Sequence, residues 1–408
     1  MTLIEKGICK ILRLNEAGLG SSKTDRGNIE LPYTLPGEIV EFERHSYRSQ
    51  KNSILKDIIE ESPDRIKPKC KYYGSCGGCN LQHINENLYK KFKLDLISSA
   101  LSKYNIDTTI KDIITPTSGR RRASLKAIRK GNKILLGFLR FQSNQIINIE
   151  ECCALSEKLS KSIPPLKEAL NKILKEKQKS VVYITEAMNG VDILIESNDN
   201  LETNITKEDL PEYVIRLRLN DSEVFAKDAP YVEFSEVKVG IDNKSFLQAT
   251  LESDKILAKI ITEHAPKNGK GVDLFSGSGT LTIPLAQLGL QMDAFESDKD
   301  AIAALSDASP NNIYITKRDL YDDPLSSDEL SIYNFAIINP PRMGAKKQIS
   351  ELAKSNISRI IYVSCNPSTF ARDASILISG GYSLLEVTPL DQFLYTNHLE
   401  VIGVFERQ

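Results

Sequence analysis

Three short segments hold the residues whose types suggest covalent chemistry. Cys365 lies in the segment YVSCNPSTFARD, directly after an apolar run, and Glu400 closes the segment NHLE. Upstream of both, Asn339 opens the segment NPPR. A cysteine thiol, with an ordinary pKa of about 8.5, is only slightly ionised at neutral pH, and a nearby cation such as Arg342 would raise the thiolate fraction. The thiolate could then attack an electrophilic carbon. The alternative is a cysteine that only packs in a core.

A glycine turn predicts a site for a cofactor that carries a nucleoside. The segment VDLFSGSGTLTIPLA, at positions 272–286, reads as a buried strand, a Gly-Ser-Gly turn and a helix. Gly277 and Gly279 let the backbone turn sharply and approach a ligand closely. The next strand ends at Glu296, whose carboxylate can accept both hydroxyls of a ribose. The segment lacks the lysine of a phosphate-binding P-loop, so it fits either a dinucleotide or S-adenosylmethionine.

A second group of cysteines has the spacing of metal ligands. Cys70, Cys76 and Cys79 are separated by five and two residues, and the two glycines before Cys79 give the backbone room to wrap around a cluster. Thiolates with no histidine at ligand spacing suit zinc or an iron–sulfur cluster. A fourth thiolate is needed, and Cys152 and Cys153 are both available.

The elements that must position these residues alternate between strand and helix from about residue 250 onward. Such alternation predicts a mostly parallel sheet with helices on both faces. Because ligands bind at the carboxyl ends of the strands in such sheets, we expect the three segments and the glycine turn to meet at one edge. The expected strands lie at 271–275, 291–296, 312–316, 335–339, 359–364, 383–388 and 401–406.

The first 240 residues have a different pattern. Residues 1–60 carry short apolar stretches between turns rich in Gly, Ser and Pro, which predicts a small β-barrel. Residues 85–104 have a helical apolar period, and the strands predicted over 119–150 carry Arg120–Arg122 and Lys126, which could contact phosphates. His83 is expected to pack or hydrogen-bond. The sequence therefore predicts three domains, at 1–62, 63–240 and 241–408.

Composition narrows the class of protein. The 408 residues are 41% hydrophobic and 26% charged, which predicts a globular protein. There is no apolar run long enough to span a membrane and no secretory signal, so we expect a cytoplasmic protein without membrane contact. Residues 1–162 carry 28 Lys and Arg against 18 Asp and Glu, whereas residues 163–408 carry 25 against 36. A basic first part beside an acidic second part indicates a polyanionic partner.

Taken together, these motifs resemble one family. The stretches SFLQAT, VDLFSGSGT, AFES, INPPR, VSCNPSTFARD and NHLE are similar, in order, to the RNA uracil-5 methyltransferases. The patterns CxxxxxCGGCxxQH and ECCAL resemble the iron–sulfur-containing 23S ribosomal RNA members, and GxG…LPGE resembles a TRAM domain. The resemblance implies a Rossmann-like S-adenosylmethionine methyltransferase domain, preceded by a small β-barrel of TRAM or OB type and an α+β domain with an iron–sulfur cluster.

The resemblance also assigns roles to residues. Cys365 would attack carbon 6 of a uracil, so that carbon 5 becomes enolate-like and takes the methyl group of S-adenosylmethionine. Glu400 would then remove the proton from carbon 5, and elimination would free the cysteine. The cofactor site would be lined by Gln248, Phe275, Glu296 and Asn339, together with the glycine turn.

For the cysteine group, the resemblance implies a 4Fe-4S cluster that stabilises the fold of an RNA-binding domain. Its ligands would be Cys70, Cys76, Cys79 and Cys152, because Leu155 falls where the family's Cys-x-x-Leu places it; Cys153 is the alternative fourth ligand. Members with both the barrel and the cysteines act mainly on large-subunit ribosomal RNA, so ribosomal RNA is favoured over transfer RNA. We expect a monomer.

Three departures from the family pattern keep two alternatives open. Asn339 stands where the family has Asp, and Thr250 and Thr280 stand where it has Asn. The NPP segment also resembles that of amino-group methyltransferases, although Arg342 replaces their aromatic residue and Cys365 would have no role. The second alternative is a non-catalytic RNA-binding protein, against which the intact Cys365, Glu400 and Gln248 argue. A measurement of S-adenosylmethionine binding would distinguish this non-catalytic protein from a methyltransferase.

Overall fold

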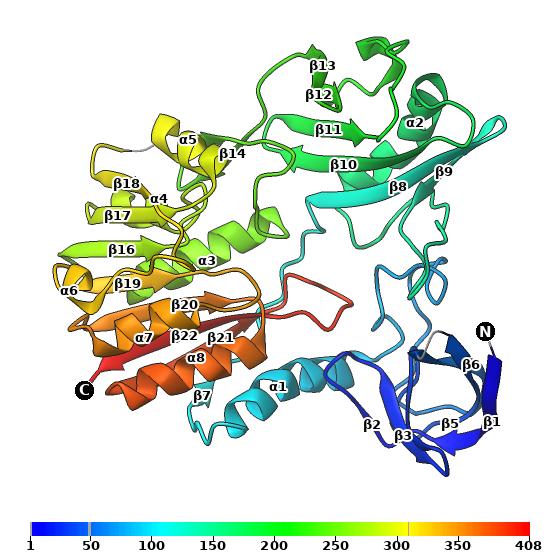
Figure 1. The fold of residues 1–408 in the computed structure, drawn as a ribbon, viewed down its shortest axis with the longest axis horizontal. Helices are drawn as coiled ribbons and strands as arrows, with labels where there is room; N and C mark the ends of the chain where they lie inside the picture. The colour runs from blue at the N-terminus through cyan, green and yellow to red at the C-terminus, as the bar shows by residue number, and fades with distance from the viewer. Residues whose placement is uncertain (1, 48–49, 309) are drawn as a thin grey trace. The chain divides into compact units, whose positions relative to one another are not determined.

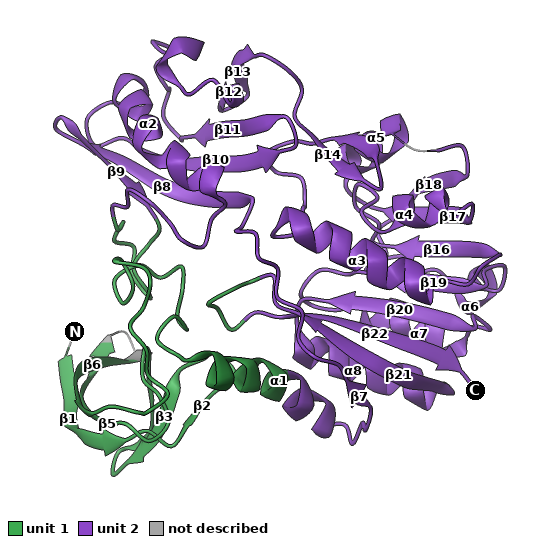
Figure 2. Ribbon diagram, turned by 180° about the vertical axis from the view of Figure 1, so that it is seen from behind, with its two compact units in different colours: residues 1–96, 138–147, 393–397 green, residues 97–137, 148–392, 398–408 purple. Residues whose placement is uncertain are grey.

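The computed structural model describes residues 2–47, 50–308 and 310–408, which form two compact units (Figure 2). Residues 1–96, 138–147 and 393–397 belong to unit 1, and residues 97–137, 148–392 and 398–408 belong to unit 2. Cys365 and Glu400 therefore both lie in unit 2. None of the helices in the described residues is long and apolar enough to cross a membrane.

Unit 1 begins with two three-stranded antiparallel sheets, in the orders β1-β5-β6 and β2-β3-β4. β1 packs beside β3 and β4 beside β6, so the two sheets enclose one apolar core of Ile11, Ile29, Leu31, Val40 and Phe42. The barrel predicted from the alternating apolar stretches is confirmed, with six strands where about five were expected. The strands are β1 (Thr2–Lys10), β2 (Arg13–Leu14), β3 (Gly20–Thr24), β4 (Gly27–Leu31), β5 (Ile39–Tyr47) and β6 (Gln50–Glu60).

After β6 the chain forms an irregular segment that holds the first three metal-spaced cysteines. It ends at α1 (Glu86–Ser102), which runs from unit 1 into unit 2. Asn85 caps this helix, since its Oδ1 accepts a hydrogen bond from the backbone nitrogen of Leu88 at 2.9 Å. Within unit 1, apolar side chains at the start of α1 pack against residues before it, in a cluster that includes Leu35, Leu81, Ile84, Tyr89 and Phe92.

The first sheet of unit 2 has six strands in the order β13-β12-β11-β10-β8-β9. α2 (Glu157–Ile173) packs against β8, β9 and β10 (Figure 1). Its buried face repeats at helical spacing, with Leu159, Ile163, Leu166 and Leu170 fully buried. The strands are β8 (Arg122–Lys130), β9 (Lys133–Gly137), β10 (Lys179–Ala187), β11 (Gly190–Glu196), β12 (Val214–Leu219) and β13 (Ser222–Ala226); η1 (Lys207–Asp209) and the hairpin β14 (Tyr231–Phe234) and β15 (Val237–Gly240) complete this part.

The second sheet of unit 2 has eight strands in the order β18-β17-β16-β19-β20-β22-β21-β7. The five strands from β18 to β20 pair in parallel, whereas β22 is antiparallel to both of its neighbours. The predicted, mostly parallel sheet is confirmed, and the reversed strand β22 is its main exception. The strands are β16 (Lys270–Leu274), β17 (Gln291–Glu296), β18 (Ile313–Lys317), β19 (Phe335–Ile338), β20 (Arg359–Ser364), β21 (Tyr382–Leu390), β22 (Glu400–Arg407) and the two-residue β7 (Thr109–Ile110).

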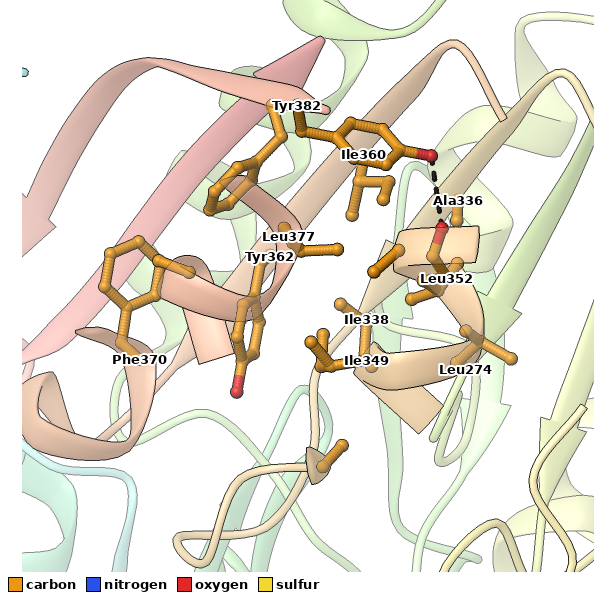
Figure 3. Packing of buried hydrophobic residues seen from close by; sticks show 14 of the residues in the cluster. Leu274, Ala336, Ile338, Ile349, Leu352, Ile360, Tyr362, Phe370, Leu377 and Tyr382 are labelled. Atoms are coloured by element: carbon orange, nitrogen blue, oxygen red, sulfur yellow. Dashed lines mark hydrogen bonds between the residues drawn. The ribbon is translucent and has the colours of Figure 1, made fainter. Parts of the chain in front are cut away.

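Helices cover both faces of this sheet (Figure 1). The cluster drawn in Figure 3 lies between α7, α8 and the strands β19 and β20, and it includes Ile338, Ile349, Ile360 and Phe370. Tyr382 belongs to it, and its hydroxyl donates to the carbonyl of Leu352 at 3.3 Å. A second apolar cluster packs around α3 and α4. The helices are α3 (Leu251–His264), α4 (Thr282–Gln287), α5 (Lys299–Ala308), α6 (Ser327–Leu330), α7 (Lys346–Lys354) and α8 (Pro367–Ser379).

The strand order reverses at one place, where a ligand-binding crevice is expected. From β16 the chain moves outward through β17 and β18, and it then returns to β19 on the other side of β16. At such a reversal the connections leave the sheet in opposite directions, so ligands bind beyond the carboxyl ends of the two strands. Here these ends are Leu274 and Ile338, which pair in the sheet.

Candidate active site

The glycine turn follows β16 directly and is wound tightly. Phe275 has a positive φ of 65°, rare for a side chain of this size. Its backbone nitrogen and that of Ser276 both donate to the carbonyl of Phe295, at 3.1 Å each. At Gly279 (φ 90°), a Cβ would lie 2.5 Å from Leu305, whereas at Gly277 (φ 54°) a Cβ would meet nothing within 4 Å. Gly279 is thus needed for packing, and the Gly277 side of the turn is open to a ligand.

Glu296 ends β17 beside this turn, as predicted. Its Oε2 accepts a hydrogen bond from the backbone nitrogen of Gly277 at 2.9 Å. Its Oε1 accepts from the nitrogens of Ser297 at 2.7 Å and Asp298 at 2.9 Å. The carboxylate is therefore held in one orientation, and Oε2, which has two lone pairs and accepts one hydrogen bond, can still receive a hydroxyl.

Asp273, which the sequence reasoning missed, lies buried beneath the turn. Burial, reinforced by the charge of Glu296, raises the pKa of Asp273 to about 7, against the opposing hydrogen bond from Thr282. In the part of the chain that is described, its Oδ1 and the hydroxyls of Ser276 and Ser278 are buried without a hydrogen-bond partner. Unpartnered buried polar atoms are costly, so these atoms suit a polar ligand such as the amino-acid part of S-adenosylmethionine. The sequence feature that could have revealed Asp273 is a single acidic residue inside an otherwise apolar strand.

Asn339 and Phe275 are brought to the crevice from its two sides. Asn339 follows β19, and its backbone nitrogen donates to the carbonyl of Leu274 at 3.2 Å. The ring of Phe275 packs against Tyr321, with ring centroids 5.3 Å apart. The structure thus places Phe275, Gly277, Gly279, Glu296 and Asn339 at the carboxyl ends of β16, β17 and β19, and their binding of the cofactor stays a prediction.

The pairing of β20 with β22 brings Cys365 to Glu400. In this antiparallel ladder Ser364 lies opposite Val401. Cys365 follows Ser364 and Glu400 precedes Val401, so the same register places Cys365 opposite Glu400. Side chains at directly opposed positions point to the same face of a sheet, with Cβ atoms about 5 Å apart. The charge of Glu400 acts on the Cys365 thiol accordingly. The two predicted catalytic residues are therefore neighbours.

The two groups differ in burial and in pKa. Glu400 is 3% exposed, and burial raises its pKa to about 7, against the opposing hydrogen bond from Gln392. Burial, followed by the charge of Glu400, raises the pKa of the half-buried Cys365 to about 11, while Arg342 lowers it. The prediction that Arg342 favours the thiolate is thus right in direction, but burial and Glu400 outweigh this effect. A second favourable influence is the N-terminus of α8, which begins two residues after Cys365.

The motif after Cys365 holds the turn that carries Arg342. The carbonyl of Arg342 accepts hydrogen bonds from Asn366 Nδ2 at 3.3 Å and Thr369 Oγ1 at 3.4 Å. Asp373 Oδ2 accepts from the backbone nitrogen of Ala345 at 3.0 Å, at the end of the same turn. Asn366, Thr369 and Asp373 of this motif therefore share one task, which is to fix the turn after β19 beside the cysteine.

Gln392 is a further site residue that the sequence reasoning missed. It lies at the end of β21, where its amide nitrogen donates to Gln248 Oε1 at 2.7 Å and to Glu400 Oε2 at 2.9 Å. Gln248, predicted to contact the cofactor, is 2% exposed and is thereby connected to the predicted base. The only sequence feature that points to Gln392 is its position, as a polar residue between an apolar strand and the NHLE segment.

Two of the arginines expected to contact phosphates have structural roles instead. Arg121 is 1% exposed; it donates to the carbonyl of Gln248 at 3.0 Å and forms an ion pair with Asp254 at 2.7 Å. Arg122 donates to the carbonyls of Asn243, at 2.5 Å, and Ser245. The predicted phosphate contact is wrong for Arg121 and Arg122, because both guanidinium groups hold the chain that carries Gln248.

The predicted cluster ligands are not gathered into a metal site. Cys70, Cys76 and Cys79 lie in unit 1, and Cys152 lies in unit 2. Over residues 2–47, 50–308 and 310–408, no group of three or more His, Cys, Asp or Glu side chains is arranged to hold a metal ion. Because Cys152 belongs to a different unit from the other three cysteines, the iron–sulfur cluster stays a prediction. His83 is fully buried and hydrogen-bonds Tyr73 through Nδ1 at 2.5 Å, as expected of a packing residue.

Comparison with known proteins gives matches along nearly the whole chain. The tRNA (uracil-5-)-methyltransferase family model matches residues 88–408, and a model of the TRAM domain of tRNA (uracil(54)-C(5))-methyltransferase matches residues 8–63. A protein of Agrobacterium fabrum, named as an uncharacterized RNA methyltransferase, is 33% identical, with 97% of this chain and 98% of the relative covered. The 23S rRNA (uracil(1939)-C(5))-methyltransferase of Shewanella amazonensis is 28% identical, with 99% and 96% covered.

One solved structure is similar over its full length. The crystal structure of the Pyrococcus abyssi tRNA (uracil-54, C5)-methyltransferase in complex with S-adenosyl-L-homocysteine superposes with a TM-score of 0.75 at 20% identity, covering 98% of this chain and 100% of that chain. At this level of identity the match shows a shared fold.

Proposed function

Because the chain belongs to the tRNA (uracil-5-)-methyltransferase family, we propose that it methylates carbon 5 of a uridine in RNA by covalent catalysis from Cys365. The observation that carries this proposal is the register of β20 and β22, whose last pair, Ser364 and Val401, is directly followed by Cys365 and preceded by Glu400, together with the effect of the Glu400 charge on the Cys365 thiol. A nucleophile and a base side by side at the mouth of a cofactor crevice suit a reaction that needs both.

In the proposed mechanism the Cys365 thiolate adds to carbon 6 of the uracil. Arg342 and the N-terminus of α8 favour this thiolate, against burial and the charge of Glu400. The thiol gives its proton to water before the attack, so Glu400 stays ionised for the later step. S-adenosylmethionine supplies the methyl group that the activated carbon 5 takes up. Glu400 then accepts the proton from carbon 5, and the electron pair left behind expels the thiolate from carbon 6. A base with a pKa of about 7 is well matched to proton transfer near neutral pH.

The crevice at β16 and β19 is the proposed site for the methyl donor. Glu296 would receive a ribose hydroxyl through Oε2, which keeps a free lone pair. Phe275, Gly277 and Gly279 would present backbone and ring to the donor, Asn339 would close the crevice from β19, and Gln248 would supply an amide. The change from Asp to Asn at 339 replaces a charged acceptor by a group that can also donate.

For the target, we favour ribosomal RNA over transfer RNA. The support is the likeness to the Shewanella amazonensis enzyme, which is named for a 23S rRNA uridine and covers nearly the whole chain. The TRAM-like barrel would contribute to RNA binding. The proposal also includes that the protein acts as a monomer in the cytoplasm, and that its domains meet at residues 62 and 240. Amino-group transfer is the second candidate, favoured only by the NPP sequence at the crevice.

One experiment tests the reaction and the target together. Ribosomal and transfer RNA from a strain that lacks the protein would be incubated with it and labelled S-adenosylmethionine, and then digested to nucleosides. Label in 5-methyluridine from ribosomal RNA is expected. Label in 5-methyluridine from transfer RNA would overturn the target, and label in an amino-methylated base would overturn the reaction. No label in either RNA would favour a non-catalytic RNA-binding protein.

The 4Fe-4S cluster remains a proposal that rests on the cysteine spacing and the family resemblance alone. Purification without oxygen should give a brown protein with about four irons. Cys76→Ser should lose that absorption, and Cys153→Ser should keep it if Cys152 is the fourth ligand. A colourless wild type that contains zinc would refute the cluster.

A further inference from the structure

We propose that Gln392 is a positioning residue: it fixes the orientation of the Gln248 amide and holds the Glu400 carboxylate as an ionised base. The inference deepens the proposed function and rests on it. Gln392 is 2% exposed and lies between the residue predicted to meet the cofactor and the predicted base.

The backbone determines which end of the Gln392 amide is which. The two ends of a glutamine side chain are usually assigned from their surroundings. Here the backbone nitrogen of Ala249 lies 2.9 Å from one end, and because this N–H can only donate, that end must be the oxygen. The other end is therefore the NH₂ group, and its two hydrogens are directed to Gln248 Oε1 and Glu400 Oε2.

The orientation of Gln248 follows from that of Gln392. Since the oxygen of Gln248 faces the NH₂ group of Gln392, its own NH₂ group must point the other way. That nitrogen is buried, and among the residues described it has no hydrogen-bond partner. The site therefore offers a donor to an acceptor oxygen of a ligand, which could belong to the methyl donor or to the target base. If Gln248 were flipped, it would offer an acceptor instead, and an NH₂ group would face that of Gln392.

The same NH₂ group acts on the ionisation of Glu400. The groups that face this carboxyl are the Cys365 thiol from the end of β20 and the Gln392 amide from the end of β21. Arg342, after β19, acts on Cys365, and the Arg121–Asp254 ion pair lies behind the backbone of Gln248. A hydrogen bond from Gln392 favours the ionised carboxylate, which burial disfavours. Without Gln392, Glu400 would stay protonated to a higher pH and could not act as a base.

The test replaces Gln392 by methionine, which has a similar length and makes no comparable hydrogen bond. Gln348→Met is the matched control, because Gln348 is also a buried glutamine of unit 2 whose amide bonds the backbone of Leu325, at 2.8 and 3.1 Å. The pH dependence of kcat would be measured for both variants and the wild type, at saturating RNA and S-adenosylmethionine. Binding of S-adenosylhomocysteine would be measured by calorimetry, and the KM for RNA by titration.

In Gln392→Met, we expect the acidic limb of the kcat profile to move up by about one to two pH units, the effect of a lost hydrogen bond to a charged group. The covalent protein–RNA adduct should accumulate below that limb. Affinity for S-adenosylhomocysteine should fall about tenfold if Gln248 meets the methyl donor, and the KM for RNA should rise instead if it meets the base. Gln348→Met should keep the wild-type limb.

A limb that stays in place in an active, folded Gln392→Met would overturn the inference. Should that variant fail to fold, Gln392→Glu keeps the shape but, when ionised, cannot donate, so its limb should move in the same direction. A wild type that forms no 5-methyluridine would defeat the proposed function rather than the role of Gln392. In that case the fall of the urea midpoint between pH 5 and pH 8, taken relative to Glu400→Gln so that the contribution of Asp273 cancels, reads the ionisation of Glu400 without RNA. It should be shifted to higher pH in Gln392→Met, and an unshifted fall would overturn the inference.

Discussion

Replacing Glu400 by glutamine should stabilise the protein at alkaline pH while it stops the release of RNA. Burial raises the pKa of this carboxyl from 4.5 to about 7. At about 1.4 kcal/mol for each pH unit, that difference corresponds to about 3 kcal/mol in the free energy of unfolding. Below pH 4.5 the carboxyl is protonated in both states and contributes nothing. Between pH 4.5 and 7 only the unfolded chain ionises, so stability is lost, and above pH 7 the loss is constant.

Glutamine has nearly the same shape and no charge, so Glu400→Gln should escape this loss. Urea unfolding of wild type and variant would be compared at pH 5 and pH 8. The variant should gain about 3 kcal/mol relative to the wild type between the two pH values. Glu263→Gln, which removes an exposed carboxylate on α3, is the control and should gain nothing. The same variant, given RNA and S-adenosylmethionine, should accumulate a covalent adduct, because the proton on carbon 5 is not removed.

A relative stability that does not change between pH 5 and pH 8 would refute the reasoning, because it would mean that Glu400 is not penalised by burial. If the stability behaves as expected but no adduct forms, the burial argument holds and the base assignment fails.

Three further changes test other parts of the site. Cys365→Ala should abolish methyl transfer and leave the affinity for S-adenosylhomocysteine within about twofold, measured by calorimetry; full activity would defeat covalent catalysis. Gly279→Ala should weaken that affinity and cost about 1–3 kcal/mol of stability in urea, because the new Cβ needs a positive φ and meets Leu305 at 2.5 Å. Arg121→Met should lower the free energy of unfolding by about 3–5 kcal/mol, since it leaves Asp254 buried without its ion pair; a change below 1 kcal/mol would show that the pair is dispensable.

Much of the methyltransferase sheet could be predicted because its strands are buried on both faces and read as continuous apolar runs. The predicted strand at 359–364 coincides with β20, and the one at 401–406 lies within β22. The two-residue β7 was not predicted, because its pairing with β21 depends on the fold and not on a local pattern. The family and the enzyme class, an S-adenosylmethionine-dependent RNA uracil-5 methyltransferase, are confirmed.

Site residues that belong to a sequence motif could be predicted. Site residues whose roles depend only on their buried surroundings could not. Cys365 follows the end of β20 and Glu400 begins β22, and the motifs predict that they meet at one edge. They meet there because β22 runs antiparallel to β20, a reversal that the alternating pattern does not predict. Asp273, Gln392 and Arg121 owe their roles to being buried beside particular partners, and a residue type does not reveal its neighbours. The arginines show this most clearly. A run of basic residues predicts a phosphate-binding surface, and only the structure shows that Arg121 and Arg122 bind backbone carbonyls instead.

The reversed direction of β22 determines how the distance between Cys365 and Glu400, the proposed nucleophile and base, is maintained. Because β22 is antiparallel to β20, its first residue lies where the parallel strands end. The spacing of the pair is therefore a property of the backbone ladder, and it does not depend on the length of the connection between β21 and β22. Insertions in that connection leave the pair opposed, whereas one residue inserted into β22 after Glu400 would turn the carboxylate to the other face of the sheet. The sheet thus sets the spacing of the pair, while Gln392, which lies in the connection itself, sets the orientation of the carboxylate.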